Sequence, residues 1–465
     1  MSLRFDPDKY EIRTMEDGRQ SVTYRAFENL VYVEKPIDTI FQSINIYVPE
    51  RFYQGEEING YTLKTAPILF GNNVGGFFPS EPRTPEHEMF GHTSTTFYAL
   101  IHGYVVATPG ARGRVNQAED GTYYGKGQAG IVDLKAALRY LWYNADVIPG
   151  NINHIISNGT SAGGGYSALI GCYDNAAGYE AYLKALGAAD AREEVFAASC
   201  YCPVTDLEHA DLAYEWQFAG LPDFHRMHMK MGEGGRPQFS AVDGVMTEKR
   251  VALSNELAAL FPAYLNSLGL IGPDGDALTL NENGDGSFKD YILGLLAASA
   301  QGALDRGEDV SLPGIQIEDG RLVSVDFAAY MKGITRMKEA PPFDDVTMLN
   351  FENNLFGDET HDNAHFTAFS FDRSEQAEPL MASADVIRMM NPLNYMKDRS
   401  KLTQHWRFRQ GTDDRDIGFA TPAILALTLK KLGLDVDYAL TWGEKHGGDF
   451  DVPDLFGWID GLCKG

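Results

Sequence analysis

The sequence predicts an α/β protein with a mostly parallel central sheet, and two observations carry this prediction. Short continuous apolar runs followed by glycine-rich turns, at residues 66–70 and 104–107, are typical of strands that are buried on both faces. An apolar repeat of helical spacing, at residues 131–142, separates the second run from a further one at residues 154–157. Strand, helix and strand in this order form a parallel crossover unit, so we expect these runs to be inner strands of one sheet.

Further elements are expected on both sides of this unit. Residues 22–34 and 43–48 alternate apolar and polar side chains, which predicts half-buried strands that open a mixed sheet. After the unit we expect strands at residues 196–202, 405–410 and 435–441, and helices at residues 419–432 and 452–463. The alternation of strand and helix stops between residues 204 and 396, which indicates one long insertion.

The charge of the chain argues against two classes of partner. The formal net charge is −26 and the basic residues form no stripe, so nucleic acids and anionic membrane surfaces are not expected as partners. No apolar run is long enough to span a bilayer, and residues 1–10 lack the apolar stretch of a secretory signal, which predicts a cytoplasmic protein. The four cysteines are too scattered for a disulfide framework. The oligomeric state is left open.

A pentapeptide that is typical of one catalytic class follows the strand expected at residues 154–157. Gly159-Thr160-Ser161-Ala162-Gly163 matches the G-x-S-x-G turn, which holds a serine between a strand and a helix. Residues 162–170 can supply that helix. Strand, turn and helix together predict an α/β-hydrolase fold with Ser161 as the nucleophile.

A serine hydroxyl needs a histidine to take its proton and a carboxylate to orient that histidine. In this fold the acid follows the nucleophile along the chain and the histidine comes last. We expect His446 to be the base, because it follows the last predicted strand whereas His405 opens a strand. The turn after the preceding strand offers Asp413, Asp414 and Asp416, and the spacing does not choose among them.

The negative oxygen of a tetrahedral intermediate needs backbone N–H groups that already point at it. We expect one donor from Ala162, which directly follows the nucleophile, and one from Gly76, in the glycine-containing turn after the strand at residues 66–70.

The insertion divides the chain in two. We predict an α/β-hydrolase catalytic domain of residues 1–203 and 397–465, and an inserted lid domain of residues 204–396 with helices at 247–268 and 291–304. An insertion at this point should lie above the carboxyl ends of the strands, where open α/β sheets bind their ligands.

Neither a metal nor a cofactor is predicted. His361 and His365 have the spacing of two zinc ligands, but the glutamate of a zinc protease and a third ligand are missing. Residues 281–286 resemble part of a calcium loop, yet Ile292 stands where the loop needs a glutamate. The sequence also lacks the phosphate-binding glycine motifs of nucleotide enzymes.

Beyond these patterns, the sequence closely resembles the bacterial tannases, esterases that release gallic acid from galloyl esters. The resemblance runs through most of the chain and is carried by residues 66–76, 158–164, 207–218, 335–338, 352–357, 414–416 and 456–463. It implies a catalytic triad of Ser161, Asp414 and His446. It also implies that Lys338, Glu352 and Asp416 form hydrogen bonds with the three phenolic hydroxyls of a galloyl group.

These side chains suit that role, because carboxylates accept phenolic protons and an ammonium group donates one. A substrate without the hydroxyls would leave buried polar groups unpaired, which gives discrimination by hydroxyl pattern. The implied function is hydrolysis of galloyl (polyhydroxybenzoate) esters to gallate and an alcohol. An esterase for feruloyl or other acyl groups is the alternative among enzymes, and a noncatalytic binding protein on a hydrolase scaffold is the alternative of another class.

Two features refine the resemblance. Phe351 precedes Glu352 where the family pattern leads us to expect a smaller residue such as proline, so we expect a pocket of different shape. The fungal relatives clamp their acid and base together with adjacent cysteines, whereas Asp414 and His446 have no cysteine beside them in the sequence. The bacterial type therefore fits better.

Overall fold

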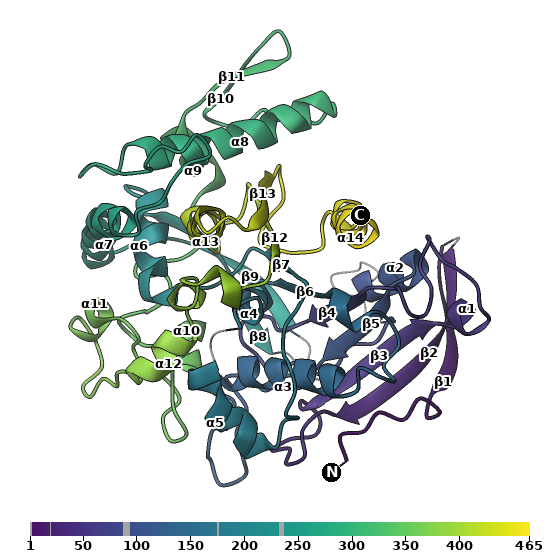
Figure 1. Ribbon diagram of the computed structural model, residues 1–465. Coiled ribbons are helices and arrows are strands. Elements are labelled where there is room, and N and C mark those ends of the chain that lie inside the picture. Colours follow the sequence, from purple (N-terminus) through teal and green to yellow (C-terminus); the bar gives the residue numbers. More distant parts are fainter. Residues whose placement is uncertain (1, 19, 87–93, 174–175, 232–236) are drawn as a thin grey trace.

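The computed structural model describes residues 2–18, 20–86, 94–173, 176–231 and 237–465, and its centre is a nine-stranded sheet (Figure 1). The strand order is β1-β2-β3-β5-β4-β6-β7-β12-β13. These strands are β1 Glu11–Asp17, β2 Gln20–Val31, β3 Ser43–Pro49, β4 Ile68–Asn72, β5 Val105–Pro109, β6 Ile155–Thr160, β7 Ala197–Tyr201, β12 His405–Gly411 and β13 Asp435–Thr441. Pairing is parallel from β5 across to β13 and antiparallel among β1, β2, β3 and β5, so the predicted mostly parallel sheet is confirmed.

Helices cover the sheet where the crossover connections require them. They are α1 Glu50–Tyr53, α2 Thr95–His102, α3 Ala129–Tyr143, α4 Ala162–Ile170, α5 Ala176–Leu186, α13 Ala420–Lys431 and α14 Val452–Lys464. The side chains of Ile131, Leu134 and Leu138, spaced for one helical face, are fully buried in α3. This helix packs against α4 and α5, and α2 packs on β2, β3 and β5.

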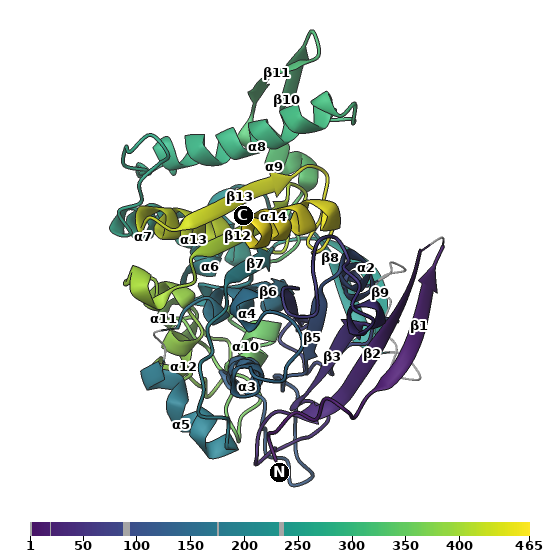
Figure 2. The same cartoon turned by 45° about the vertical axis from the view of Figure 1, so that its right-hand side comes forward.

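The long insertion forms its own set of elements between β7 and β12. They are α6 Leu207–Gln217, β8 Asp223–Met231, β9 Pro237–Val245, α7 Glu248–Ser267, α8 Ser287–Asp305, β10 Ile315–Glu318, β11 Arg321–Val325, α9 Phe327–Ile334, α10 Phe351–Leu355, α11 Ala368–Phe371 and α12 Ala384–Met389. In both views the hairpin β10–β11 projects beyond α8 at the top of the molecule, and α12 lies beside α5 (Figures 1 and 2). Segments of the insertion therefore reach both the β13 side and the α5 side of the sheet.

The strands of the structure differ from the sequence prediction in three respects. Strand β3 was expected to be half-buried, but all seven of its residues are buried, because β3 lies between β2 and β5 in the sheet and α1 and α2 pack on it. Strand β1 extends the sheet by one strand beyond the expected first strand. The hairpins β8–β9 and β10–β11 were not predicted, and each forms a separate two-stranded sheet.

One hydrophobic cluster runs through the described residues of the sheet, its helices and the insertion. It contains Ile156 and Phe408 of the sheet together with Phe261, Leu296 and Tyr330 of the inserted segment. The insertion thus shares apolar contacts with the sheet domain, and this burial is the main source of its stability. Within the described part of the chain, no helix has the length and apolar character needed to cross a membrane.

Candidate active site

Ser161 stands at the sharp turn between β6 and α4, as the pentapeptide predicted. Its φ of 61° and ψ of −121° are unfavourable for a residue with a side chain, so neighbouring contacts must hold them. A Cβ atom on Gly159 would lie 2.3 Å from the carbonyl oxygen of Gly163, and one on Gly163 would lie 2.8 Å from Oδ1 of Asn72. The flanking glycines are therefore needed for close packing of the turn.

His446 connects the serine to an aspartate. Its Nε2 lies 2.9 Å from Oγ of Ser161, and its Nδ1 lies 3.1 Å from both carboxylate oxygens of Asp414. Of the three aspartates that the spacing left open, Asp414 is the one beside the histidine. Asp413 instead accepts a hydrogen bond from Tyr330. These distances are those of a hydrogen-bonded nucleophile, base and orienting acid.

The surroundings of Asp414 hold it as a carboxylate. The side chain is fully buried, and its Oδ1 accepts a hydrogen bond from the backbone N–H of Asp416 at 2.9 Å. Burial by itself would raise the pKa of Asp414, but the imidazole of His446 and these hydrogen bonds lower it below the ordinary value. In the opposite sense, burial would lower the pKa of His446, but the carboxylate of Asp414 raises it well above the ordinary value.

The loop after β13 carries His446 across the serine turn. A Cβ atom on Gly448 would lie 1.7 Å from Oγ1 of Thr160, so the loop can approach residue 160 this closely only with glycine at this position. Beyond it, Oδ1 of Asp449 accepts a hydrogen bond from the side chain of Asn158 at 2.9 Å, which ties the loop to β6. The histidine and the serine are therefore held together by contacts between the loop and β6.

The two expected backbone donors lie on segments that contact each other. The N–H of Gly163 donates to the carbonyl oxygen of Val74 at 2.9 Å, which joins the start of α4 to the loop after β4. The carbonyl of Gly75 accepts from the N–H of Phe78 at 3.0 Å. In a trans peptide the N–H points opposite to the carbonyl, so the N–H of Gly76 points away from Phe78. The N–H of Ala162, at the first position of α4, has no acceptor four residues earlier in the helix.

Lys338, Glu352 and Asp416 come from three separate segments. Nζ of Lys338 lies 3.4 Å from Oδ1 of Asp416, which belongs to the same turn as Asp414. Glu352, in α10, is buried and interacts electrostatically with both. The backbone N–H of Lys338 is fixed by the hydroxyl of Tyr214 at 3.1 Å. The structure thus brings a lysine and two carboxylates to the turn that orients His446.

Burial affects the charges of this group in opposite ways. It would lower the pKa of Lys338, but the carboxylates of Asp416 and Glu352 outweigh it and raise the pKa. Burial raises the pKa of Glu352, and the ammonium of Lys338 offsets this only in part. A carboxyl with a raised pKa and an ammonium that stays charged are suited to exchange hydrogen bonds with ionisable hydroxyls.

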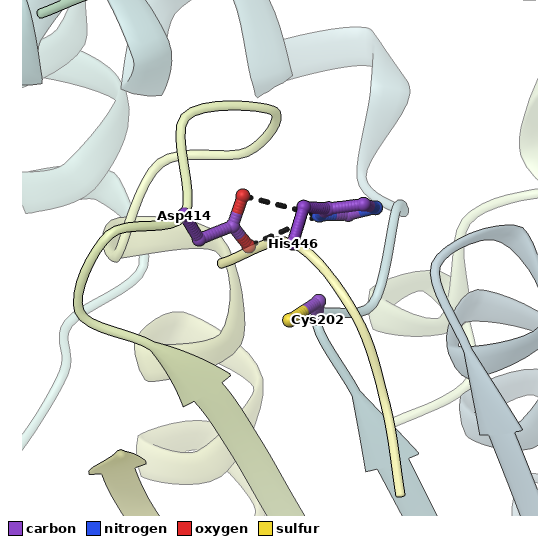
Figure 3. A group of neighbouring side chains, drawn as sticks. All are labelled: Cys202, Asp414 and His446. Atoms are coloured by element: carbon purple, nitrogen blue, oxygen red, sulfur yellow. Dashed lines mark hydrogen bonds and ion pairs between the residues drawn. The ribbon is translucent and has the colours of Figure 1, made fainter. Parts of the chain in front are cut away.

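Cys202, one of the four scattered cysteines and a residue for which the sequence predicted no role, lies beside the site. It is fully buried after β7, and its thiol donates to the carbonyl oxygen of Gly447 at 3.2 Å. Figure 3 shows Cys202 next to the pair formed by Asp414 and His446. The cysteine sulfur, a carboxylate oxygen of Asp414 and a ring nitrogen of His446 all lie within 4.8 Å of one another. The residues around Cys202 in the sequence give no sign of this contact, because the contact joins residues that are far apart along the chain.

The two histidines that were set aside as metal ligands, and His405, which was set aside as the base, have other partners. His361 pairs with Asp358 at the surface, at 2.9 Å. His365 is fully buried and bonds Asp344 through Nδ1 at 2.7 Å. His405 pairs with Asp435 at the start of β12, at the opposite end of that strand from Asp414.

The fold and the arrangement of Ser161, His446 and Asp414 define an α/β hydrolase. Comparison with solved structures identifies its family. The chain is 44% identical to a tannase from Fusobacterium nucleatum, with 100% of each chain covered and a TM-score of 0.95. It is 45% identical to a tannase from Lactobacillus plantarum, covering 99% of this chain and 100% of that one, with a TM-score of 0.95.

A third solved structure, a tannin acyl hydrolase in complex with ethyl gallate, is 44% identical over 99% of both chains, with a TM-score of 0.92. The chain belongs to the bacterial tannase family. No family model matches the sequence, and no curated protein matches it.

Proposed function

We propose that this protein hydrolyses galloyl esters to gallate and an alcohol through an acyl-enzyme. The observation that carries the proposal is the hydrogen-bonded series of Ser161, His446 and Asp414 next to a lysine and two carboxylates. The relative that binds ethyl gallate, similar to this chain over almost its whole length, supports the same acyl group here.

In the proposed first step, Oγ of Ser161 attacks the ester carbonyl carbon while Nε2 of His446 takes the hydroxyl proton. The resulting oxyanion accepts hydrogen bonds from the backbone N–H groups of Ala162 and Gly76. His446 then gives its proton to the alcohol oxygen, which leaves with the electrons of the ester bond. Water repeats the sequence on the galloyl-enzyme and releases gallate. Asp414 fixes the tautomer of His446 and stabilises its positive charge in both halves.

Recognition of the acyl group would come from Lys338, Glu352 and Asp416, which we propose bind the three ring hydroxyls. Glu352 is buried and the other two side chains are partly buried, so a ring without hydroxyls would leave hydrogen-bonding groups of this cluster unsatisfied, which costs more than a missing apolar contact. Two of the three come from residues 204–396, so we propose that this segment acts as a lid that completes the acyl site. The cytoplasmic location and the lack of a nucleic acid partner stay predictions.

The proposal is tested by rates on methyl gallate, methyl protocatechuate, methyl ferulate, methyl benzoate and p-nitrophenyl acetate. Methyl gallate should have the highest kcat/KM of the methyl esters, and Ser161→Ala should remove essentially all turnover. Lys338→Ala should lower kcat/KM for methyl gallate by roughly 10–100-fold, as expected for a hydrogen bond to a charged group. It should leave p-nitrophenyl acetate within a few-fold of wild type. Lys332→Ala, an exposed lysine of α9, is the matched control.

Other outcomes identify the alternatives. A preference for methyl ferulate would indicate a feruloyl esterase, and equal losses on both kinds of ester in Lys338→Ala would remove Lys338 from recognition. Failure of a fluorophosphonate probe to label Ser161 would indicate a binding protein without catalysis.

A further inference from the structure

The turn that carries Gly76 has an unfavourable backbone. The turn runs from Gly75 to Phe78, and the carbonyl oxygen of Gly75 accepts a hydrogen bond from the N–H of Phe78 at 3.0 Å. Both central residues have a positive φ, 53° for Gly76 and 56° for Phe77. This is the pattern of a type I′ turn, in which glycine, asparagine or aspartate normally occupies the central positions. Phe77 is bulky and buried, so its left-handed conformation must be enforced by its surroundings.

Arg114 contacts both central residues of this turn. Its Nε donates to the carbonyl oxygen of Gly76 at 2.8 Å, and its backbone N–H donates to the carbonyl oxygen of Phe77, also at 2.8 Å. Gly113, which precedes Arg114, packs directly on the backbone that follows the turn, because a Cβ atom on Gly113 would lie only 2.1 Å from the nitrogen of Pro79. These contacts fix the two peptide planes that follow Gly76, because the carbonyl groups of Gly76 and Phe77 both accept hydrogen bonds from Arg114.

The same guanidinium reaches α10 in the insertion. Nη1 of Arg114 donates to Oδ1 of Asn354 at 2.8 Å. The guanidinium carbon lies 3.9 Å from the ring centre of Phe78 and 4.3 Å from that of Phe351, so it stands between an aromatic side chain of the turn and one of α10. Phe351, whose size departs from the family pattern, therefore packs on one face of the guanidinium, and Glu352 directly follows it in the chain.

The partners of Arg114 distinguish it from other buried arginines. Arg112, two residues earlier, pairs with Asp133 at 2.8 Å, and Arg336 pairs with Glu215. Arg114 is only 5% exposed, yet among the described residues no carboxylate lies within ion-pair distance of it. Its close partners are instead one backbone carbonyl, one amide side chain and two rings. Such a set suits a residue that holds two segments in register.

We propose that Arg114 is a positioning residue for the reaction. It fixes the turn that aims the Gly76 N–H and holds α10 against that turn, so that the oxyanion donors and Glu352 keep a constant separation. This inference rests on the proposed function. It assigns to one side chain two effects that can be measured separately, one on turnover through the turn and one on galloyl binding through α10.

The test compares Arg114→Lys and Arg114→Ala with wild type on p-nitrophenyl acetate and methyl gallate. Loss of one oxyanion donor lowers kcat by about 10²–10³-fold, so a misaligned donor should lower kcat on both esters by roughly 10–100-fold. KM should rise for methyl gallate only. Arg139→Lys is the matched control, since Arg139 is a buried arginine that bonds Glu193 and Glu180, and it should leave both constants unchanged.

A second variant separates the two effects. Asn354→Ala removes the hydrogen bond between Arg114 and α10 without touching the turn, so it should raise KM for methyl gallate and keep kcat on p-nitrophenyl acetate. If Arg114→Ala does not fold, Arg114→Lys and Asn354→Ala decide. The proposal is overturned if Arg114→Lys folds and its kcat on both esters and its KM for methyl gallate stay within two-fold of wild type.

The test also stands apart from the proposed acyl preference. A wild-type protein that cleaves p-nitrophenyl acetate but not methyl gallate would contradict galloyl hydrolysis. The effect of Arg114 on kcat for the simple ester would then still decide its role in the turn, with a normal kcat overturning it.

Discussion

His446 is the residue whose protonation sets the pH range in which the proposed mechanism can operate. To accept the serine proton it must be neutral, and the carboxylate of Asp414 raises its pKa well above the ordinary 6.5. Below this raised pKa the imidazole already holds a proton and cannot act as base, so kcat/KM should increase as the pH rises through it. We expect the acidic limb of the profile to lie above pH 6.5 in the free enzyme.

Asp414→Asn tests whether the acidic limb of the kcat/KM profile comes from His446 and is placed by the charge of Asp414. It removes the negative charge that raises the pKa of His446, so the limb should move to lower pH, while kcat falls by about 10⁴-fold because the tautomer is no longer fixed. The profile should be measured on p-nitrophenyl acetate, which has no ring hydroxyls to ionise. A limb that stays in place would show that another group titrates there.

Cys202 and Arg114 illustrate what sequence patterns at single residues could not supply. A motif predicted Ser161, because a strained turn requires that pattern, and chain order predicted His446, because the fold fixes the order of nucleophile, acid and base along the chain. The contacts of Cys202 with Gly447 and of Arg114 with Asn354 join residues 245 and 240 positions apart. Such contacts depend on how the elements pack, which neither composition nor spacing encodes.

The element that most directly controls the site is the loop between β13 and α14. Gly447 and Gly448 follow His446 and offer a matched pair of substitutions. A Cβ atom on Gly448 would meet Thr160 at 1.7 Å, whereas the nearest atom to one on Gly447 lies 4.0 Å away. Gly448→Ala must therefore push the loop off β6 and move the His446 ring, and Gly447→Ala need not.

We expect Gly448→Ala to lower kcat on methyl gallate by roughly 10²-fold, because small displacements of a catalytic group are costly, and Gly447→Ala to stay within a few-fold of wild type. Steady-state kinetics and thermal melts of both variants are the measurement. Equal activities would mean that the loop can shift without moving the histidine.

The elements themselves were predicted most accurately where apolar periodicity was strong. Helix α4 and strand β13 have the predicted bounds, and the ends of α3 and α7 differ by one or two residues. The short helices α10, α11 and α12 were missed, because polar contacts hold them. Buried Asp344 accepts hydrogen bonds from Asn353 of α10 and from the backbone N–H groups of Phe366 and Thr367 before α11, and Oγ of Ser383 caps α12 by accepting from the N–H of Val386. Strand β1 was missed because its residues are mostly exposed, so it shows little apolar pattern.

At the scale of the whole molecule, the inserted segment and the sheet domain share one hydrophobic cluster. The boundaries at residues 203 and 397 stay a prediction from the sequence. Helix α6 packs on both α7 and α13, so an element at the start of the insertion contacts one near the end of the sheet domain. Shared burial of this kind favours unfolding of both parts together rather than in two steps.

The ion pair of Arg336 and Glu215 tests this coupling. Both side chains are fully buried, and Nε of Arg336 also donates to the carbonyl oxygen of Lys338 at 2.7 Å. Arg336→Met leaves Glu215 without its partner, which should cost about 3–5 kcal/mol of unfolding free energy. Replacing both residues, with Glu215→Leu, removes the unpaired charge and should recover most of that loss.

Urea unfolding followed by tryptophan fluorescence and by turnover of p-nitrophenyl acetate measures the effect. If the insertion and the sheet unfold together, both signals should shift to the same lower midpoint in Arg336→Met and return together in the double variant. The double variant should still bind methyl gallate more weakly than wild type, because Lys338 has lost the hydrogen bond that fixes its carbonyl. Two separate fluorescence transitions, of which Arg336→Met shifts only one while the activity transition stays in place, would mean that the insertion unfolds on its own and that Arg336 stabilises only that part.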